Sequence, residues 1–216
     1  MKNVIILGAS GMIGNRVLQH CLASAEIQSV TSIVRRPGKL LHPKLHEVVH
    51  DEFLNFSSIE KNFADKQIAF YCLGAYTGAV NDALFKQITV DFTRSFANTL
   101  SKMSPDLTFC FLSGQGADLT GKSRVSFARY KGMAENYLIE KQFSHFYSFR
   151  PAYIYPVEKR REPNLLYRSM RRLYPLIRML GVKFSITSAE LATAIFKTGL
   201  YGAPHTILEN ADIRSL

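Results

Sequence analysis

Three glycines near the N-terminus stand at intervals of three residues between an apolar run and a helical pattern. Gly8, Gly11 and Gly14 follow the run Val4–Leu7. A turn that holds a pyrophosphate needs a tight bend, bare backbone beside the phosphates and close helix–strand packing, and glycine meets all three demands. Backbone N–H groups at the positive end of the following helix would face the anion, with the Ser10 hydroxyl as a further donor. The cofactor-binding turn predicted here consists of Gly8, Ala9, Ser10, Gly11, Met12, Ile13 and Gly14.

Two adjacent arginines follow the second apolar run, where the chain reads Ile33-Val34-Arg35-Arg36-Pro37. In dinucleotide-binding folds, an acidic residue at this point accepts hydrogen bonds from the ribose 2′-hydroxyl of NAD, whereas a guanidinium pairs with the 2′-phosphate of NADP. Arg35 and Arg36 without a neighbouring carboxylate therefore predict NADP (NADPH) as the cofactor. The alternative is that the two arginines belong to an ordinary solvated loop.

Strand and helix patterns alternate along the chain and provide the elements that must position these residues. The strand patterns cover Asn3–Leu7, Gln28–Val34, Leu45–Val49, Gln67–Leu73, Leu107–Leu112, His145–Phe149 and, more weakly, His205–Leu208. The helix patterns cover Met12–Ser24, Ser58–Ala64, Val80–Met103 and Phe127–Lys141. Such alternation indicates a mainly parallel sheet with helices on both faces, which is a three-layer, doubly wound α/β fold of Rossmann type.

The composition changes after Pro156, where residues 158–183 carry eight basic and two acidic side chains. Apolar residues from Tyr167 to Leu180 interleave with arginines, and this pattern predicts an amphipathic helix in a small basic cap. We expect a single domain over residues 1–216, with 157–216 forming the C-terminal cap and the final elements. The basic face either attracts an anionic substrate or partner or is simply solvated. No helix-turn-helix, zinc-finger or RNA-binding signature indicates sequence-specific binding of nucleic acid.

Length and residue usage favour a cytoplasmic globular protein. The 216 residues are 47% hydrophobic, which suffices for one sizeable core. Cys21, Cys72 and Cys110 lie far apart without a CxxC pair, as is typical of reduced core cysteines. Histidines recur at every fourth position from 42 to 50, but Pro43 interrupts any helix there, so we predict no metal site. No apolar run approaches the roughly 18 residues of a membrane-spanning helix, and the first one is too short for a signal peptide.

Seven motifs in a fixed order carry a resemblance to a known family. They are LGASGMIG, IVRRP, YCLGAYTG, FLSGQGAD, ARYKGMAE, SFRPAYIY and LEN. Together they resemble the atypical short-chain dehydrogenase/reductases, and within them the Tat-interacting-protein-like oxidoreductases, from the first strand to Asn210. The resemblance implies Asp51 near the adenine, Leu73, Gly74 and Ala75 beside the nicotinamide ribose, and Pro151 near the nicotinamide.

The same resemblance implies a catalytic serine, a tyrosine, and a lysine four residues after the tyrosine. In that arrangement the lysine contacts the ribose and lowers the pKa of the phenol, which protonates a carbonyl as hydride arrives, while the serine orients that carbonyl. Ser113 and Lys131 match, and Lys131 is also the implied cofactor contact. Phe127 stands four residues before Lys131 and has no ionisable proton, so the motif does not identify the proton donor.

Tyr130 is the candidate substitute for the missing phenol. Residues i and i+4 share a helix face, whereas Tyr130 and Lys131 point about 100° apart. Tyr130 would reach the site only if the helix started late or shifted its register; otherwise its ring packs against a neighbouring element with the hydroxyl at the surface. Tyr76 and Tyr153 are further candidate proton donors because they fall on loops beside the predicted nicotinamide position.

The sequence therefore predicts an NADP-dependent oxidoreductase that acts on a small carbonyl substrate. Ser113, Lys131 and Tyr130 are its candidate catalytic residues. The alternative is a regulatory protein that senses NADPH, has lost turnover and acts through a protein partner; Phe127 keeps that alternative open. The sequence also leaves open an anionic substrate and a homo-oligomer.

Overall fold

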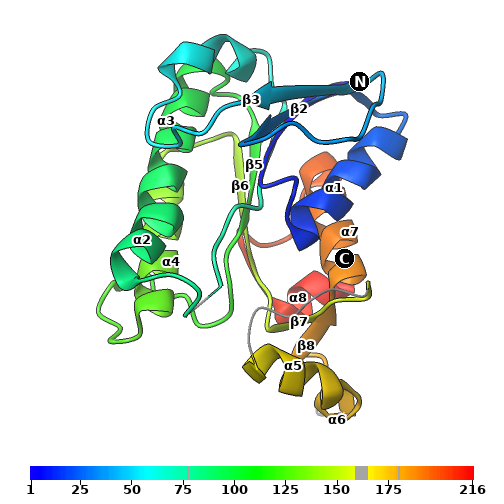
Figure 1. Ribbon diagram of the computed structural model, residues 1–216, viewed down its shortest axis with the longest axis vertical. Coiled ribbons are helices and arrows are strands. Elements are labelled where there is room, and N and C mark those ends of the chain that lie inside the picture. The colour runs from blue at the N-terminus through cyan, green and yellow to red at the C-terminus, as the bar shows by residue number, and fades with distance from the viewer. Residues whose placement is uncertain (77, 159–164, 180) are drawn as a thin grey trace.

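A central sheet lies between two layers of helices (Figure 1) in the computed structural model, which describes residues 1–76, 78–158, 165–179 and 181–216. The sheet has seven strands in the order β3-β2-β1-β4-β5-β6-β9, and every neighbouring pair is parallel. Its strands are β1 (Lys2–Leu7), β2 (Ile27–Val34), β3 (Leu45–Val49), β4 (Ile68–Tyr71), β5 (Thr108–Leu112), β6 (His145–Arg150) and β9 (Ile207–Glu209). The three-layer, doubly wound fold predicted from the alternation is confirmed.

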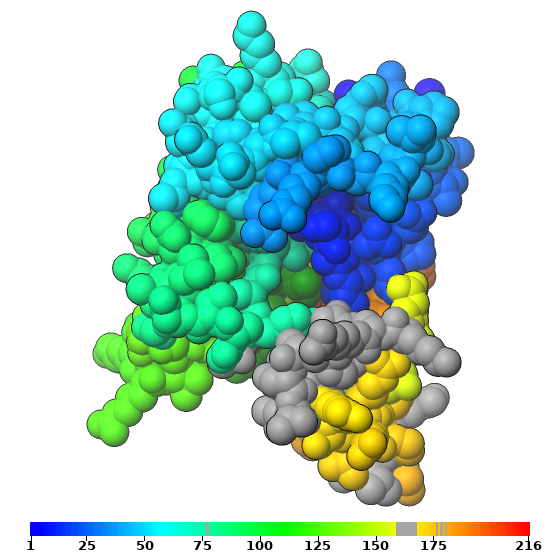
Figure 2. All heavy atoms as spheres, in the orientation of Figure 1, coloured from blue at the N-terminus to red at the C-terminus, as the bar shows by residue number. Residues whose placement is uncertain are grey.

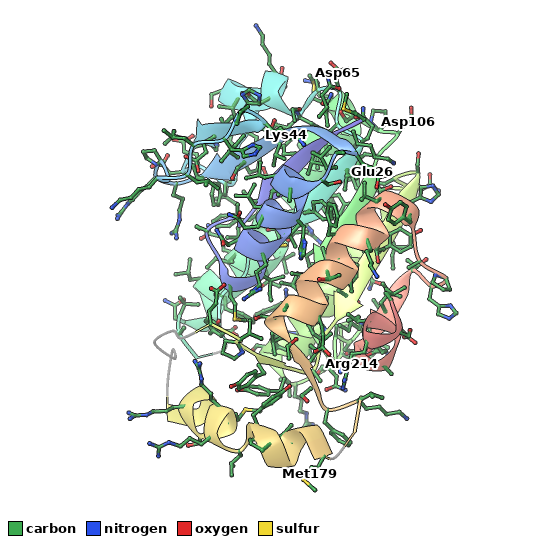
Figure 3. The ribbon with its side chains drawn as sticks, turned by 90° about the vertical axis from the view of Figure 1, so that its right-hand side faces the viewer. Glu26, Lys44, Asp65, Asp106, Met179 and Arg214 are labelled. Atoms are coloured by element: carbon green, nitrogen blue, oxygen red, sulfur yellow. The ribbon has the colours of Figure 1, made fainter. Side chains whose placement is uncertain are left out.

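Helices cover both faces of the sheet. One face carries α1 (Met12–Ala23), α7 (Ser188–Tyr201) and α8 (Asn210–Ser215), and the other carries α2 (Asp82–Lys86), α3 (Phe92–Met103) and α4 (Ser126–Glu140). Figure 3 shows α1 and α7 side by side over the first face. An apolar core fills each interface: Val17, Ile195 and Phe149 belong to the first, and Phe96 and Phe109 belong to the second.

Two predicted helices differ from the pattern in the sequence. The predicted helix Val80–Met103 begins at Asp82, and a π-helical segment, Gln87–Asp91, separates α2 from α3. The predicted helix Ser58–Ala64 is instead a 3₁₀ segment, Ser57–Phe63. Both departures change the local winding of the backbone.

The cap lies beyond the main sheet and contains two short helices, α5 (Leu165–Arg172) and α6 (Tyr174–Met179). The prediction of one amphipathic helix here is wrong, because Pro175 lacks the N–H that a continuous helix would need. A small parallel pair, β7 (Tyr153–Tyr155) with β8 (Ser185–Thr187), joins the cap to the body. The predicted basic residues at 159–161 and the side chains at 165–167, 176 and 178 lie outside the described part of the chain.

The chain returns from the cap into the body through α7. A capping box begins this helix: Thr187 Oγ1 accepts a hydrogen bond from the N–H of Glu190, and the Glu190 carboxylate accepts one from the N–H of Thr187. This capping box satisfies donors that the helix end would leave unpaired. The helix then packs on α1, and β9 completes the sheet beside β6.

Candidate functional site

The turn after β1 is shaped by its glycines. Gly8 has a φ of +93°, and a Cβ there would lie 2.6 Å from the carbonyl carbon of Cys72. A Cβ on Gly14 would overlap the carbonyl oxygen of Gly8. The predicted tight bend and close helix packing therefore have a direct cause in the structure, because no larger residue fits at either position.

The N-terminus of α1 follows this turn and presents its backbone to a cleft. Gly11 is the N-cap residue, its N–H donates to the Gly8 carbonyl oxygen at 3.0 Å, and the first turn of α1 contains no acidic residue. The first N–H groups of an α-helix have no intrahelical acceptor, and the helix dipole makes this end positive. Gly11, Met12 and Ile13 line the cleft, so an anion placed there would meet unpaired donors.

The cleft has a volume of about 380 Å³ and runs along the carboxyl ends of β1, β4, β5 and β6. Its walls are residues 72–76 after β4, residues 112–114 at the end of β5, Phe127 and Lys131 of α4, and residues 151–154 with Pro156 after β6. Met170 of α5 closes one side. Figure 2 shows the surface hollowed between the N-terminal segment in blue and the middle of the chain in green. The order of strands changes direction between β1 and β4, which is where open α/β sheets bind ligands.

Lys131 lies against the cleft wall with 7% of its surface exposed. Its Nζ donates a hydrogen bond to the carbonyl oxygen of Leu112 at 2.8 Å and lies 5.0 Å from the centre of the Phe111 ring. Burial lowers the pKa of Lys131 to about 8, and attraction to Glu135 opposes this shift. The ammonium is thus held in place before any ligand arrives.

Ser113 stands beside Lys131 and has a polar group without a protein partner. Its Oγ is buried, and none of the residues that the structure describes forms a hydrogen bond with it. A buried hydroxyl left without a partner is costly, so an orphaned one at a cleft wall is well suited to a ligand.

Phe127 occupies the helix position at which the family motif has a tyrosine. Its ring lines the cleft and stacks on Phe85 of α2, with the ring centres 6.4 Å apart and the planes at 20°. A Cβ on Gly114 would overlap Phe127 Cζ, so the ring also lies close against the Gly114 backbone. Phe127, which replaces the tyrosine of the motif, therefore forms an apolar wall that is packed against both Phe85 and Gly114.

Tyr130 points away from the cleft. Its hydroxyl donates to Asp82 Oδ2 at 2.7 Å, and its ring packs against Phe85. Hydrogen bonds from Ser126 and Tyr130 hold the pKa of Asp82 below its usual range. The structure brings Ser113 and Lys131 together but does not bring Tyr130 to them. Tyr76 and Tyr153, the other two tyrosines considered, both line the cleft.

The residues predicted for the adenine half lie at the ends of β2 and β3. Arg35 and Arg36 follow β2, Asp51 lies just after β3, and all three are exposed. Within the described ranges, neither guanidinium forms a hydrogen bond or an ion pair with the protein. Of the residues predicted for the nicotinamide half, Leu73, Gly74, Ala75 and Pro151 all line the cleft.

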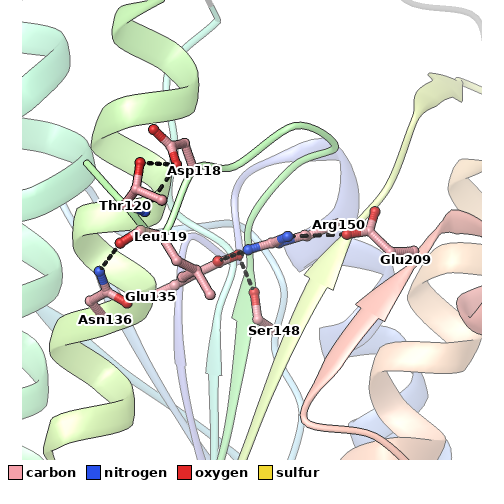
Figure 4. Close-up of polar contacts among 8 residues, drawn as sticks. All are labelled: Asp118, Leu119, Thr120, Glu135, Asn136, Ser148, Arg150 and Glu209. Atoms are coloured by element: carbon pink, nitrogen blue, oxygen red, sulfur yellow. Dashed lines mark hydrogen bonds and ion pairs between the residues drawn. The ribbon is translucent and has the colours of Figure 1, made fainter. Parts of the chain in front are cut away.

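A buried ion pair that the sequence analysis missed supports the same region (Figure 4). Glu135, which is 0% exposed, accepts hydrogen bonds from Ser148 Oγ at 2.6 Å, from Arg150 Nε at 3.0 Å and from Arg150 Nη2. Arg150 Nη1 also reaches Glu209 at 3.1 Å. The network ties α4 to β6 and β9 directly below Pro151. Glu135 follows Lys131 by four residues, and residues at this spacing lie on the same face of a helix. This spacing is the feature of the sequence that could have indicated that Glu135 lies near the site.

No helix among the described residues is long and apolar enough to cross a bilayer. They also contain no group of three or more His, Cys, Asp and Glu side chains able to hold a metal ion. All three cysteines are free; Cys21 and Cys110 are buried, while Cys72 lines the cleft.

Comparison with known proteins gives relatives over part or all of the chain, although no family model matches. HTATIP2 of Rattus norvegicus is 30% identical over 154 residues, which is 69% of this chain and 62% of that protein. The matched region thus spans less than two thirds of the rat protein. FMP52 of Saccharomyces cerevisiae, named as mitochondrial, is 28% identical over 69% of this chain and 64% of its own length. The Aspergillus oryzae protein fmp52-2, also named as mitochondrial, is 23% identical over 99% of this chain and 96% of its own length.

Solved structures share the fold at low sequence identity. The Bordetella bronchiseptica enzyme WbmH, in complex with NAD⁺, superposes with a TM-score of 0.72 at 16% identity, covering 97% of this chain and 75% of that one. A UDP-N-acetylglucosamine 4-epimerase from Methanobrevibacter ruminantium has a TM-score of 0.68 at 18% identity, with 96% and 76% covered. At these identities the likeness shows the fold alone.

The sheet order and the glycine turn define a Rossmann-type fold. In sequence, the chain is similar to HTATIP2 and FMP52, and it resembles the atypical short-chain dehydrogenase/reductases. The resemblance predicted from the ordered motifs is confirmed.

Proposed function

We propose that this protein binds NADPH and uses it to reduce a small carbonyl substrate. The observation that carries the proposal is one continuous cleft that is lined by the N-terminus of α1, by Ser113 with its orphaned hydroxyl and by Lys131. The first would hold a pyrophosphate, and the other two would meet a ribose and a carbonyl oxygen.

The residues present fit a nicotinamide dinucleotide. Glycines leave bare backbone beside the expected pyrophosphate, and a Cβ on Gly74 would meet nothing within 4 Å, so the cleft is open at the expected ribose. Arg35 and Arg36 offer two guanidiniums to a 2′-phosphate, whereas a carboxylate selecting NAD is absent from the described end of β2. Asp51 would lie near the adenine.

When bound, the cofactor supplies a hydride, and the protein's own groups do the remaining work. Ser113 Oγ would donate a hydrogen bond to the substrate carbonyl oxygen. Lys131 would hold a ribose hydroxyl and place its positive charge close to the negative charge that develops on that oxygen. Pro151 and its neighbours would exclude water from the reacting atoms.

The cofactor assignment is tested by titrating ligand-free protein with NADPH and NADH in a calorimeter. We expect NADPH to bind at least about tenfold tighter, because hydrogen bonds to charged groups contribute roughly 1.5–3 kcal/mol. Arg35→Ala and Arg36→Ala should each narrow the gap, and Arg94→Ala, an exposed arginine on α3, is the matched control. Equal affinities for the two cofactors would contradict the NADP preference, and no heat from either would contradict the proposed function.

The second candidate function is an NADPH-sensing regulatory protein that acts through a protein partner, and Phe127 favours it by replacing the expected phenol. Turnover separates the two candidates. If the protein oxidises NADPH above background with any member of a panel of aldehydes, ketones and quinones, and Lys131→Ala loses this rate, the result supports the enzyme function. Tight NADPH binding without turnover on any of them supports the sensor.

A cytoplasmic location and assembly with other copies of this chain extend the proposal. Because two of the relatives are named as mitochondrial, fractionation of cells that express the tagged chain is the deciding measurement for location. Sedimentation of the purified protein with and without NADPH measures the oligomeric state.

A further inference from the structure

The described walls of the cleft beside Ser113 offer almost no charge to a substrate. Among its described lining residues, Lys131 is the one with a formal charge. That ammonium is already engaged by the Leu112 carbonyl oxygen and the Phe111 ring. The walls outside the cofactor positions include Phe127, Ile154 and Met170. A phosphate or carboxylate on the substrate would find no free cation at these walls, whereas an uncharged ring system would be buried favourably.

Phe127 forms a flat and fixed wall of that cleft. Phe85 stacks on one side of its ring, and the Gly114 backbone meets the ring edge. A Cβ on Gly114 would overlap Phe127 Cζ while staying 3.2 and 3.5 Å from the two flanking ring carbons, so the long axis of the ring points at Gly114. A hydroxyl on Cζ would therefore run into the Gly114 backbone. The packing around position 127 therefore leaves no room for the hydroxyl of a tyrosine.

The absence of a phenol at this position limits which carbonyl can be reduced. Hydride addition to an isolated ketone leaves an alkoxide, which is about as basic as hydroxide and therefore needs a positioned acid to protonate it. Reduction of a quinone instead leaves a phenolate, whose parent acid resembles tyrosine with a pKa of about 10. The quinone product needs no positioned acid, because water can protonate it after the hydride has moved.

Resting on the proposed NADPH-dependent function, we infer that the substrates of this cleft are flat, uncharged quinones. One quinone carbonyl accepts a hydrogen bond from Ser113, and the ring lies along the face of Phe127. The quinone takes two electrons and one proton as hydride from NADPH and a second proton from water, which gives NADP⁺ and the hydroquinone. The cleft volume of about 380 Å³, shared with the nicotinamide end of the cofactor, limits the quinone to one or two fused rings.

The probe is duroquinone, tetramethyl-1,4-benzoquinone, in which every ring carbon is substituted. This choice matters because Cys72 lines the cleft and would add to a quinone that has a free ring position. Calorimetry measures duroquinone binding to protein saturated with NADP⁺, with UDP-glucose titrated in parallel. We expect saturable heat from duroquinone and none from UDP-glucose. Hydroquinone formed per NADPH consumed, expected to be one to one, is the second readout.

Phe127→Leu tests the wall directly, because it keeps an apolar side chain but removes the flat face. Loss of ring stacking should weaken duroquinone binding by about fivefold, while NADPH affinity stays the same. Tyr137→Leu is the control, since Tyr137 lies on the same helix but contacts Arg94 and Asn98 outside the cleft. Equal weakening in both variants overturns the assigned role of Phe127.

The two levels of the proposal fail in different ways. Protein that binds NADPH but binds UDP-glucose or a simple aldehyde in preference to duroquinone overturns the quinone assignment and leaves the NADPH-dependent function standing. Protein that binds no NADPH overturns both. Duroquinone binding and reduction that survive Phe127→Leu unchanged overturn the stacking geometry.

Discussion

Removing the charge of Arg150 should destabilise this protein far more than removing an ordinary surface charge. In Arg150→Met the apolar stem remains, but Glu135 loses two of its three hydrogen-bond donors and keeps only the Ser148 hydroxyl. The Glu135 side chain is 0% exposed, so water cannot replace the guanidinium. The variant therefore leaves a buried carboxylate without the cation that is hydrogen-bonded to it.

The expected cost follows from that burial. Breaking a buried ion pair by removing one partner costs about 3–5 kcal/mol of unfolding free energy. For a chain of this length, each kcal/mol lowers Tm by about 2–4 °C, so Tm should fall by roughly 10 °C. The Lys102–Glu60 pair joins Nζ to Oε2 at 3.0 Å, but its side chains are 68% and 38% exposed. Lys102→Met should therefore cost less than about 1 kcal/mol.

The assay is guanidinium-induced unfolding at pH 7, followed by far-ultraviolet circular dichroism and by tyrosine fluorescence. Coincident transitions from the two probes license a two-state free energy. The double variant Glu135→Gln with Arg150→Met completes a cycle, and it should be more stable than Arg150→Met alone because the unpaired charge is gone. If Arg150→Met lowered the unfolding free energy no more than Lys102→Met does, the claim that burial makes this ion pair important for stability would be refuted.

Four further variants test the site. The ¹³C resonance of the Lys131 Cε, identified by its loss in Lys131→Met, should titrate near pH 8. Because the pKa of Lys131 is lower in the folded protein than in the unfolded chain, the unfolding free energy should rise from pH 8 to about 10.4. This rise should be absent in Lys131→Met. Gly14→Ala should lower Tm because its Cβ overlaps backbone, whereas Gly74→Val, whose Cβ enters open space, should keep Tm and weaken NADPH binding in calorimetry. Tyr130→Phe should leave NADPH affinity and any turnover unchanged, since its hydroxyl bonds to α2 outside the cleft; a large loss of rate would place Tyr130 back among the catalytic candidates.

The parts of the fold that depend on local pattern could be predicted from the sequence. The apolar run of β1, the glycine spacing and the helix after it are all contained within residues 2–23, and the structure has them where the pattern indicated. The seven strands of the main sheet were found for the same reason, because each is a short apolar stretch between polar turns. The break between α5 and α6 was missed although Pro175 signals it.

Features that depend on contacts between distant segments could not be predicted. Arg150 sits at the end of a strand, where a lone arginine usually faces solvent. Its partner Glu135 lies 15 positions earlier on a helix, and only the packing of α4 against β6 shows that the two meet in the interior. The pair β7–β8 likewise joins segments about 30 residues apart. Neither three-residue strand has enough length to give a periodic signal.

Helix α4 shows how a spacing in the sequence became a constraint on chemistry. Lys131 and Phe127 share the face that lines the cleft, whereas Tyr130 turns to α2, as the rotation of about 100° per residue requires. There is no free space for a hydroxyl at the tip of the Phe127 ring, because the backbone of Gly114 lies where that hydroxyl would be. The loss of the phenol and the glycine that accommodates the ring form one packed unit. Any substrate reduced here meets the Lys131 ammonium and the Ser113 hydroxyl at the buried wall, with Tyr76 and Tyr153 elsewhere along the cleft.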